Sequence, residues 1–271
     1  MDTEEDNVRR NSPSVDLEIT RVWLDRDQEE DTKDEVVVED QTELYVDDAL
    51  YAVFSCSPHE RKELVVGHLL TEGVIRKPDE IAGLEMSEGS AHIRLAKQHA
   101  PFHDRPRQVS SACASGTLKI PPHLLKRAHK KARDTGFRIS RQNISGAVKL
   151  LNLEASIFRR TGGTHAAALV DDNGRVVVFS EDIGRHNAVD KAIGKAALRG
   201  ERLDIMLLAS TGRITFEMVI KAATVGIPVI VSISAPTDKA VKTAAMLDLT
   251  LVGFARARRF SIYTCPERIV V

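Results

Sequence analysis

A chain of 271 residues, 42% of them hydrophobic and 28% charged, has the size and composition of an ordinary soluble protein with a sizeable core. No run of about 18 apolar residues is present to span a membrane, and the acidic N-terminus argues against a secretory signal peptide. We therefore expect a cytoplasmic protein. Three scattered cysteines, Cys56, Cys113 and Cys265, are too few for a disulfide framework or a four-ligand zinc site, so any cysteine chemistry involves a single thiol.

The net charge of -1 hides an uneven distribution along the chain. Residues 1–48 contain 18 acidic and 5 basic residues, whereas the rest of the chain contains 21 acidic and 33 basic residues. A basic body can attract nucleic acid, a phosphate-rich cofactor or an acidic protein, and charge alone does not choose among these ligands. The plainer alternative is a solvated surface with an acidic tail.

The N-terminal half predicts a disordered tail followed by short strands. Residues 1–15 are polar and have no apolar periodicity, which is typical of disorder. Alternating or continuous apolar residues predict strands at 17–23, at 35–39, at 49–55 and around Ile93.

Two helices are predicted in this half. Ser57, Pro58 and Glu60 predict a capping box that starts the first helix, which runs to about Glu72 before Gly73. A second, basic helix is predicted over residues 124–133. No aromatic side chains interleave its lysines and arginines, so we expect a solvated face and no nucleic-acid surface.

From Ala166 onward, short apolar strands alternate with helices. This alternation indicates a mainly parallel or mixed sheet that is covered on both faces. Asp172, Asn173 and Gly174 predict a hairpin turn between the first two strands. The predicted strands are 166–170, 176–179, 205–209, 229–233 and 249–254, and the predicted helices are 187–199, 215–225 and 238–247.

Four polar, glycine-containing blocks lie at predicted strand ends, where ligands of α/β sheets bind. They are residues 161–165, residues 181–191, residues 210–221 and residues 254–259. In the second block, a helix start offers free backbone amides beside three polar side chains, which is a natural site for an anion. In the last block, planar guanidinium groups suit phosphates.

Several strings in these blocks resemble successive motifs of the formate dehydrogenase accessory sulfurtransferase family. The resemblance runs from about Leu17 to Thr264 and implies an α/β (α+β) fold. That fold has a cytidine-deaminase-like three-layer α/β/α domain and a smaller β-rich N-terminal domain. The strings are SPHERKELVVGHLLTEGVI, FRRTGGTHAAAL, EDIGRHNAVDKAIG, STGRITFEMVIKAA, SISAPTDKAV and LTLVGFARARRFSIYT.

The resemblance implies a division of the chain into three parts. Residues 1–16 form the acidic tail, residues 17–135 form the β-rich domain with the Cys113 loop, and residues 136–271 form the cofactor-binding domain. The resemblance also assigns the arginine-rich block to the cofactor site, to which we add nearby polar residues of the other blocks. These candidates are Phe254, Ala255, Arg256, Ala257, Arg258, Arg259, His165, Arg185, His186, Asn187 and Arg213.

The resemblance further implies a homodimeric sulfur carrier. Such a protein accepts persulfide sulfur from a cysteine desulfurase and transfers it to the bis-molybdopterin guanine dinucleotide form of the molybdenum cofactor. The cofactor is then inserted into formate dehydrogenase. We expect guanosine diphosphate to mimic the bound cofactor, and we expect no resident metal, no nucleic acid and no membrane partner.

The thiol motif of this chain departs from the family pattern. Residues 109–117 read VSSACASGT, where the family usually has Ser-Ser-Gly-Cys-Gly-x-Cys-Gly. Cys113 matches the first cysteine and Gly116 replaces the second, although a shifted alignment would put Ser115 at the second cysteine. One thiolate suffices to carry a persulfide, but an internal disulfide needs two thiols. Cys56 and Cys265 are expected to be structural.

Three other functions are alternatives to sulfur transfer: cofactor chaperone, nucleotide-dependent regulator and zinc-dependent deaminase. A chain without the second cysteine could bind the molybdenum cofactor as a chaperone without transferring sulfur. It could also be a nucleotide-dependent regulator, although no phosphate-binding loop for nucleotide hydrolysis is present. Zinc-dependent deamination is excluded, because Ala166 and Ala167 follow His165 where His-x-Glu is required, and no Cys-x-x-Cys exists.

Overall fold

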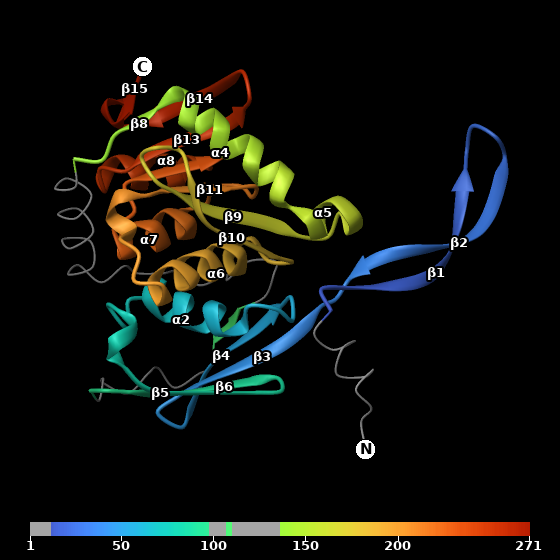
Figure 1. Ribbon diagram of the computed structural model, residues 1–271, viewed down its shortest axis with the longest axis horizontal. Coiled ribbons are helices and arrows are strands. Elements are labelled where there is room, and N and C mark those ends of the chain that lie inside the picture. Colours follow the sequence, from blue (N-terminus) through green and yellow to red (C-terminus); the bar gives the residue numbers. More distant parts are fainter. Residues whose placement is uncertain (1–11, 98–106, 110–135) are drawn as a thin grey trace.

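A computed structural model describes residues 12–97, 107–109 and 136–271. The predicted tail up to residue 11, the predicted basic helix and the Cys113 loop lie outside these residues. Figure 1 shows a larger sheet with helices on both faces, a smaller sheet below it, and a long hairpin that projects to one side. No helix within the described ranges is long and apolar enough to cross a membrane.

The larger sheet is mixed, as the sequence predicts. Its strand order is β10-β9-β11-β12-β13-β14, in which β11, β12 and β13 are parallel and the other neighbours are antiparallel. The Asp172–Gly174 turn joins β9 to β10, and Gly174 adopts a φ of 82° there. The strands are β9 (His165–Val170), β10 (Val176–Asp182), β11 (Leu207–Ser210), β12 (Val229–Ser232), β13 (Thr250–Arg256) and β14 (Arg259–Thr264).

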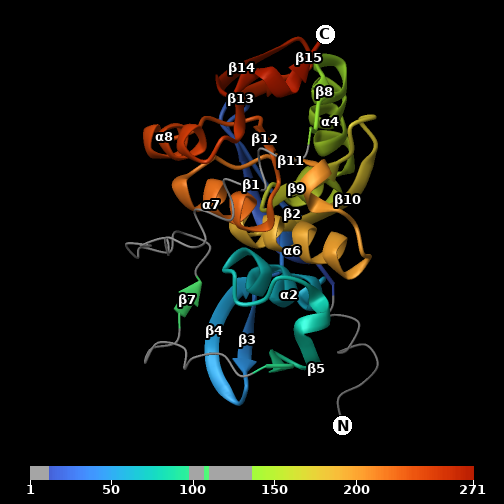
Figure 2. The same ribbon diagram turned by 90° about the vertical axis from the view of Figure 1, so that its left-hand side faces the viewer.

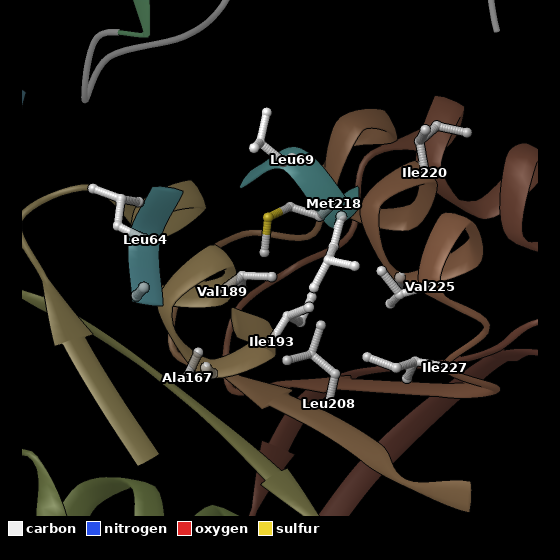
Figure 3. Packing of buried hydrophobic residues seen from close by; sticks show 14 of the residues in the cluster. Leu64, Leu69, Ala167, Val189, Ile193, Leu208, Met218, Ile220, Val225 and Ile227 are labelled. Carbon is white, nitrogen blue, oxygen red and sulfur yellow. The ribbon is translucent and has the colours of Figure 1, made fainter. Parts of the chain in front are cut away.

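Helices cover both faces of this sheet because successive strand residues point to opposite sides. Leu208 and Ile230 enter the core beneath α6, α7 and α8, whereas Ala209 and Val231 enter the core beneath α4. Figure 3 shows the first core, where Leu208 lies among side chains of α6 and α7. The helices are α4 (Arg141–Glu154), α5 (Ser156–Thr161), α6 (Arg185–Leu198), α7 (Phe216–Val225) and α8 (Asp238–Met246).

The smaller sheet has the order β5-β6-β3-β4-β7. Its strands are β3 (Asp40–Val46), β4 (Ala49–Cys56), β5 (Ile81–Ser87), β6 (Ser90–Leu95) and β7 (Arg107–Val109). Short elements complete the described chain, namely β8 (Ile139–Ser140), which pairs with β15 (Ile269–Val270), and the 3-10 turns η1 (Pro78–Glu80), η2 (Leu203–Ile205) and η3 (Pro266–Arg268).

Helix α2 (Arg61–Thr71) joins the smaller sheet to the larger one (Figure 2). It packs on α6 through two glycines. A Cβ at Gly67 would lie 1.8 Å from the backbone oxygen of Asp190, and a Cβ at Gly194 would lie 2.0 Å from that of Glu63. Because the two backbones touch, buried residues of both sheets belong to one continuous core.

The predicted capping box of α2 is wrong. The helix begins at Arg61, and Glu60 is left-handed and provides no side-chain cap. The Ser57 hydroxyl accepts instead from the amide of Ile183 at 3.2 Å, and the Ser57 amide donates to Asp182 at 3.0 Å. A tertiary contact with the larger sheet has therefore taken the place of the local cap.

The projecting hairpin, which we call the arm, consists of β1 (Ser14–Trp23) and β2 (Gln28–Val37). Its first strand begins three residues earlier than predicted, within the segment expected to be a disordered tail. Its second strand includes the acidic run 28–34, which the sequence did not predict as a strand because acidic residues have low β propensity.

A buried ionic cluster also links α2, α6 and α7. The Lys221 ammonium lies 2.8 Å from an Asp190 oxygen, and the His68 ring lies 3.1 Å from the same atom. Burial alone would raise the pKa of Asp190, but the charge of Lys221 and hydrogen bonds from His68 and Lys221 lower it to about 2. Asp190 is therefore ionised at neutral pH, within the core.

We predict that Gly67→Ala destabilises the protein by about 3 kcal/mol, because the new methyl group overlaps a backbone oxygen of α6 that cannot move aside. Gly146→Ala in α4 is the matched control, since nothing lies within 4 Å of its Cβ position. The control should stabilise the protein by about 0.5–1 kcal/mol. Urea unfolding measures both, and equal effects would contradict the close packing of α2 on α6.

We also predict that Lys221→Met lowers the free energy of unfolding by about 3–5 kcal/mol, because it leaves the buried Asp190 carboxylate without its main counter-charge. The control is Lys242→Met, which removes a pair with Asp238 that is almost fully exposed. Urea unfolding at pH 7 should show no measurable change for the control. A similarly small change for Lys221→Met would mean that the cluster is solvated.

Candidate functional site

Four of the polar blocks meet at one edge of the larger sheet. The parallel strands β11, β12 and β13 all end there, and β9 begins there at His165. Helix α6 also starts at this edge, directly after β10. Because the carboxyl ends of parallel strands share an edge, residues far apart in sequence are brought together.

Hydrogen bonds join the two loops that follow β11 and β12. The Ser232 hydroxyl donates to the Gly212 carbonyl at 2.6 Å and accepts from the Ser234 amide at 2.9 Å. The Thr211 hydroxyl accepts from the Ala166 amide at 3.0 Å, which ties the first loop to β9. The hydroxyl groups of Ser232 and Thr211 thus hold the two loops to each other and to β9.

His165, Arg185 and His186 lie near one another at this edge. A His165 ring nitrogen is 3.3 Å from the Thr211 hydroxyl, and the His186 ring is 3.2 Å from the Glu217 carboxylate. Burial lowers the pKa of His165, and the positive charges of Arg185 and His186 lower it further. The imidazole of His165 is therefore neutral at pH 7 in a basic surrounding.

Glycine is required where the loop after β11 approaches α6. A Cβ at Gly212 would lie 2.9 Å from the Cβ of Arg185, so only glycine lets the loop pass this close to the side chain. The next residue, Arg213, is exposed at the rim. The loop therefore positions Arg185 from one side and presents Arg213 to solvent.

Other residues of the 181–191 block make their contacts inside the fold. Glu181 caps α5, accepting from the amides of Ile157 and Phe158 at 3.1 and 2.9 Å. Asp182 forms a fully buried ion pair with Lys191 at 2.6 Å. These contacts place the acidic part of the block and Lys191 inside the fold, and Arg185 and His186 are themselves largely buried at the edge.

Asn187 also has internal partners. Its amide donates to the Ser55 carbonyl at 2.8 Å and to Asp182 at 3.0 Å. It therefore connects the end of β4 to the first turn of α6. Its predicted contact with the cofactor stays a prediction, and its observed contacts hold the N-terminus of α6 against the smaller sheet.

Phe254 presents an exposed ring from a strained backbone. Its φ is 51°, and its side chain is 47% exposed at an irregularity between β13 and β14. The preceding Gly253 is enclosed, since a Cβ there would lie 2.8 Å from Pro236 and 3.0 Å from the Tyr263 ring. Left-handed backbone costs about 1–3 kcal/mol at a residue other than glycine, and such strain is concentrated at functional sites.

The remaining residues of the arginine-rich block continue from the same edge into the β13–β14 turn. Arg256, Arg258 and Arg259 are exposed, as is Ala257, whereas Ala255 is buried in the core beneath α4. The Ser145 hydroxyl of α4 donates to the Ala257 carbonyl at 2.7 Å and holds the turn. The Arg256 guanidinium donates to the carbonyls of Ile233 and Ala255, and Arg258 and Arg259 are displayed on the turn.

The spacing of the strands sets the width of this edge. Three strand intervals separate β9 from β13, and each interval is about 4.8 Å, so His165 and the Phe254 segment lie on the order of 14 Å apart along the edge. A single phosphate would not reach both ends. A nucleotide or dinucleotide would be long enough.

The two described thiols are poorly suited to nucleophilic chemistry. Cys56 is fully buried beside Thr42, and burial raises the pKa of its thiol. Burial and the charge of Asp248 raise the pKa of the Cys265 thiol. Both thiols are free. Cys113, the predicted sulfur-carrying residue, lies outside the described residues, four positions after β7.

An acidic group near the C-terminus could be mistaken for a metal site. Ligand atoms of Asp248, Cys265 and Glu267 lie within 4.8 Å of one another. However, the buried Arg268 guanidinium is 2.8 Å from the Asp248 carboxylate and supplies the positive charge that a metal ion would bring. The group is therefore an internal ion pair.

Some residues that shape the site were not singled out from the sequence. Ser232 ends an apolar strand, and Thr211 lies in the same polar block as Arg213. A serine at the end of an otherwise apolar strand was the available signal for Ser232. Conversely, Lys191 and Lys221 were grouped with the ligand-binding blocks, but the structure places both in the interior.

Comparisons with known proteins find relatives that match most of the chain. Three relatives, each called sulfur carrier protein FdhD, come from Thermoplasma acidophilum, Bacillus subtilis and Staphylococcus aureus. They are 38%, 33% and 37% identical, over 79%, 88% and 88% of this chain and 77%, 91% and 91% of their own.

A solved structure and a family model extend the similarity to the whole fold. A crystal structure from Desulfotalea psychrophila, assigned as a formate dehydrogenase accessory protein, has a TM-score of 0.78 and 25% identity. It covers 96% of this chain and 100% of its own. The sequence model of the FdhD/NarQ family matches residues 37–270. The chain is therefore a member of the FdhD/NarQ family.

Proposed function

We propose that this chain is a sulfur carrier for formate dehydrogenase. It accepts sulfur from a cysteine desulfurase as a persulfide on Cys113 and passes it to the bis-molybdopterin guanine dinucleotide cofactor, which is its substrate. The observation that supports this most is the basic, aromatic edge of the larger sheet, formed by Arg185, His186, Arg213 and the Phe254–Arg259 block. The names of the full-length relatives point to the same activity.

The loading step is an exchange between two thiols. The Cys113 thiolate would attack the outer sulfur of the donor persulfide, so that a new S–S bond forms on Cys113 and the donor cysteine leaves as a thiolate. No electrons are gained or lost overall. Unloading as sulfide requires two electrons, which must come from an external thiol because Gly116 replaces the second cysteine of the family motif.

Neither Cys56 nor Cys265 suits the carrier role, which leaves Cys113 as the candidate. A persulfide carrier needs an accessible thiolate, and burial opposes ionisation of both Cys56 and Cys265. Strand β7, which ends at Val109, runs parallel to β4 and pairs Val109 with Phe54. Strand β7 therefore ends at the end of the smaller sheet where Ser55 of β4 accepts a hydrogen bond from Asn187 of α6.

The edge of the larger sheet suits a guanine dinucleotide. The exposed Phe254 ring offers a flat surface on which a base can stack, and arginines on either side can bind phosphates in pairs of hydrogen bonds. Arg185 and His186 lie in the first turn of α6, where the backbone amides also favour an anion. The width of the edge matches the length of such a ligand.

A second candidate is a chaperone that binds the cofactor without transferring sulfur. Gly116 is the observation that favours it, because the resolving cysteine of the family motif is missing. Mass spectrometry after incubation with a cysteine desulfurase and cysteine separates the two. A gain of about 32 Da on the Cys113 peptide supports the carrier, since only a nucleophilic thiolate accepts the sulfur.

We predict that Cys113→Ser abolishes activation of formate dehydrogenase and also abolishes the mass gain. The control, Cys265→Ser, removes a thiol whose raised pKa disfavours the thiolate and should keep both. Peptide mapping without reductant should find the persulfide of the unchanged protein stable until a thiol is added. An internal disulfide between Cys113 and either other cysteine would contradict the single-thiol mechanism.

We further predict that Phe254→Ala weakens binding of guanosine diphosphate about tenfold, because the base loses its stacking partner.

Simultaneous replacement of Arg256, Arg258 and Arg259 by alanine should also weaken binding of guanosine diphosphate. It should make the affinity less dependent on salt concentration, because fewer charged contacts to the phosphates remain. Arg175→Ala is the control, since this exposed arginine lies by the β9–β10 turn, at the opposite edge of the sheet. Calorimetry that finds the control as weak as the others would place the site elsewhere.

A further inference from the structure

His165 lies where β9, the first turn of α6 and the loop after β11 meet. Ala167 and Leu169 share its side of β9 and enter the core beneath α6, so His165 lies on the same face of the sheet as this helix. Its ring is half-buried at the edge of the sheet. The ring is therefore close to the part of the edge that we propose for the phosphates of the cofactor.

The Thr211 hydroxyl fixes one nitrogen of this ring. It accepts from the Ala166 amide at 3.0 Å and donates to the Ala166 carbonyl at 3.5 Å. Because the hydroxyl proton is directed at the carbonyl, the hydroxyl oxygen meets Nδ1 of His165, 3.3 Å away, as an acceptor. Nδ1 therefore carries the proton of the neutral ring, and Nε2 carries a lone pair.

Nε2 is the nitrogen that remains for a ligand. Within the described residues, the contact with Thr211 is the one hydrogen bond of the His165 ring. A phosphate oxygen is itself an acceptor, so it would be repelled by the Nε2 lone pair. A proton on Nε2 turns the same contact into a charge-assisted hydrogen bond. A phosphate beside Nε2 therefore requires the protonated ring.

The charged groups around His165 keep the ring neutral in the absence of an anion. Burial lowers the pKa of His165, and the charges of Arg185 and His186, both in the first turn of α6, lower it further. Asp182, the β10 partner of His165, acts in the opposite direction, but its carboxylate is paired with Lys191. A phosphate beside Arg185 would offset the guanidinium charge and favour the imidazolium.

Two more charges lie nearby, on the loop after β11 and on α7. Arg213 is exposed at the rim, and Glu217 lies 3.2 Å from the His186 ring. Because the Glu217 carboxylate is paired with His186, it leaves the charge of Arg185 as the main one acting on His165. An anion that neutralises Arg185 thus changes the proton affinity of His165.

We propose that His165 is a proton-coupled phosphate contact of the cofactor site. Nucleotide binding transfers a proton from solvent to Nε2, and the imidazolium then donates to a phosphate oxygen while Nδ1 keeps its contact with Thr211. The proposal rests on the proposed binding of a guanine nucleotide at this edge. Because coupling between two ligands is reciprocal, acidification strengthens nucleotide binding through the same residue.

Calorimetric titration with guanosine diphosphate, in buffers of different ionisation enthalpy, measures the proton uptake. At pH 7 the unchanged protein should take up about one proton per nucleotide more than His165→Gln, and its affinity should fall about tenfold per pH unit toward pH 8. The glutamine amide supplies a permanent N–H donor, so the affinity of the variant should change far less over this range. Ionisation of the nucleotide is common to both proteins and cancels in the comparison.

His92→Gln is the matched control. His92 is exposed and stacks on Tyr45 in the smaller sheet, so this variant should keep the proton uptake of the unchanged protein. Nitrogen-15 NMR of the histidine rings adds a measurement that needs no substitution. The free protein should show His165 protonated at Nδ1 alone, and the nucleotide complex should show both ring nitrogens protonated.

The outcomes separate this inference from the proposed function. Equal proton uptake by the unchanged protein and His165→Gln would overturn the inference and leave the cofactor site in place. A free ring that is protonated at Nε2 would overturn it in the same way, because the phosphate would then need no added proton. Failure of guanosine diphosphate to bind at all would overturn the inference together with the proposed cofactor site.

Discussion

The contact between α2 and α6 is the constraint on which the rest of the structure depends. Gly67 and Gly194 allow the two helix backbones to touch, and this contact places the smaller sheet against the larger one. The buried charges of Asp190 and Lys221 lie beside the same contact and tie α7 to it. Moving α7 away from this contact would leave a buried charge without its partner, so the ion pairs add to the constraint that packing imposes.

This constraint also positions the site. The Asp182–Lys191 pair and the amide of Asn187 bind the loop after β4, so the first turn of α6 is fixed from the side of the smaller sheet. In that same turn, Arg185 lies against Gly212 and His186 lies 3.2 Å from Glu217, so both meet the segment that follows β11.

The sequence predicts the larger sheet well and the contacts between its parts poorly. Strands such as 229–233 and helices such as 215–225 have a strong apolar period, and the structure confirms both. Helix α4 has a weaker apolar pattern, and the sequence does not predict it. The acidic strand β2 forms against its low local β propensity, because pairing with β1 outweighs that propensity.

Contacts between distant parts of the chain explain the other differences. The predicted cap at Ser57 is wrong because the partners of Ser57, Ile183 and Asp182, lie more than a hundred residues away. Among the candidate site residues, those at strand ends were predictable by position, but the interior roles of Lys191 and Asn187 depend on tertiary contacts that no local pattern reveals.

A crystal structure of the protein grown with guanosine diphosphate tests the central claim most directly, because it locates the nucleotide atom by atom. The account predicts the guanine base against the Phe254 ring, with the phosphates between Arg256 and the first turn of α6 at Arg185 and His186. Nucleotide bound on the smaller sheet, or on the β9–β10 side of the larger sheet, would contradict the account. So would an edge that stays empty at nucleotide concentrations that saturate binding in solution.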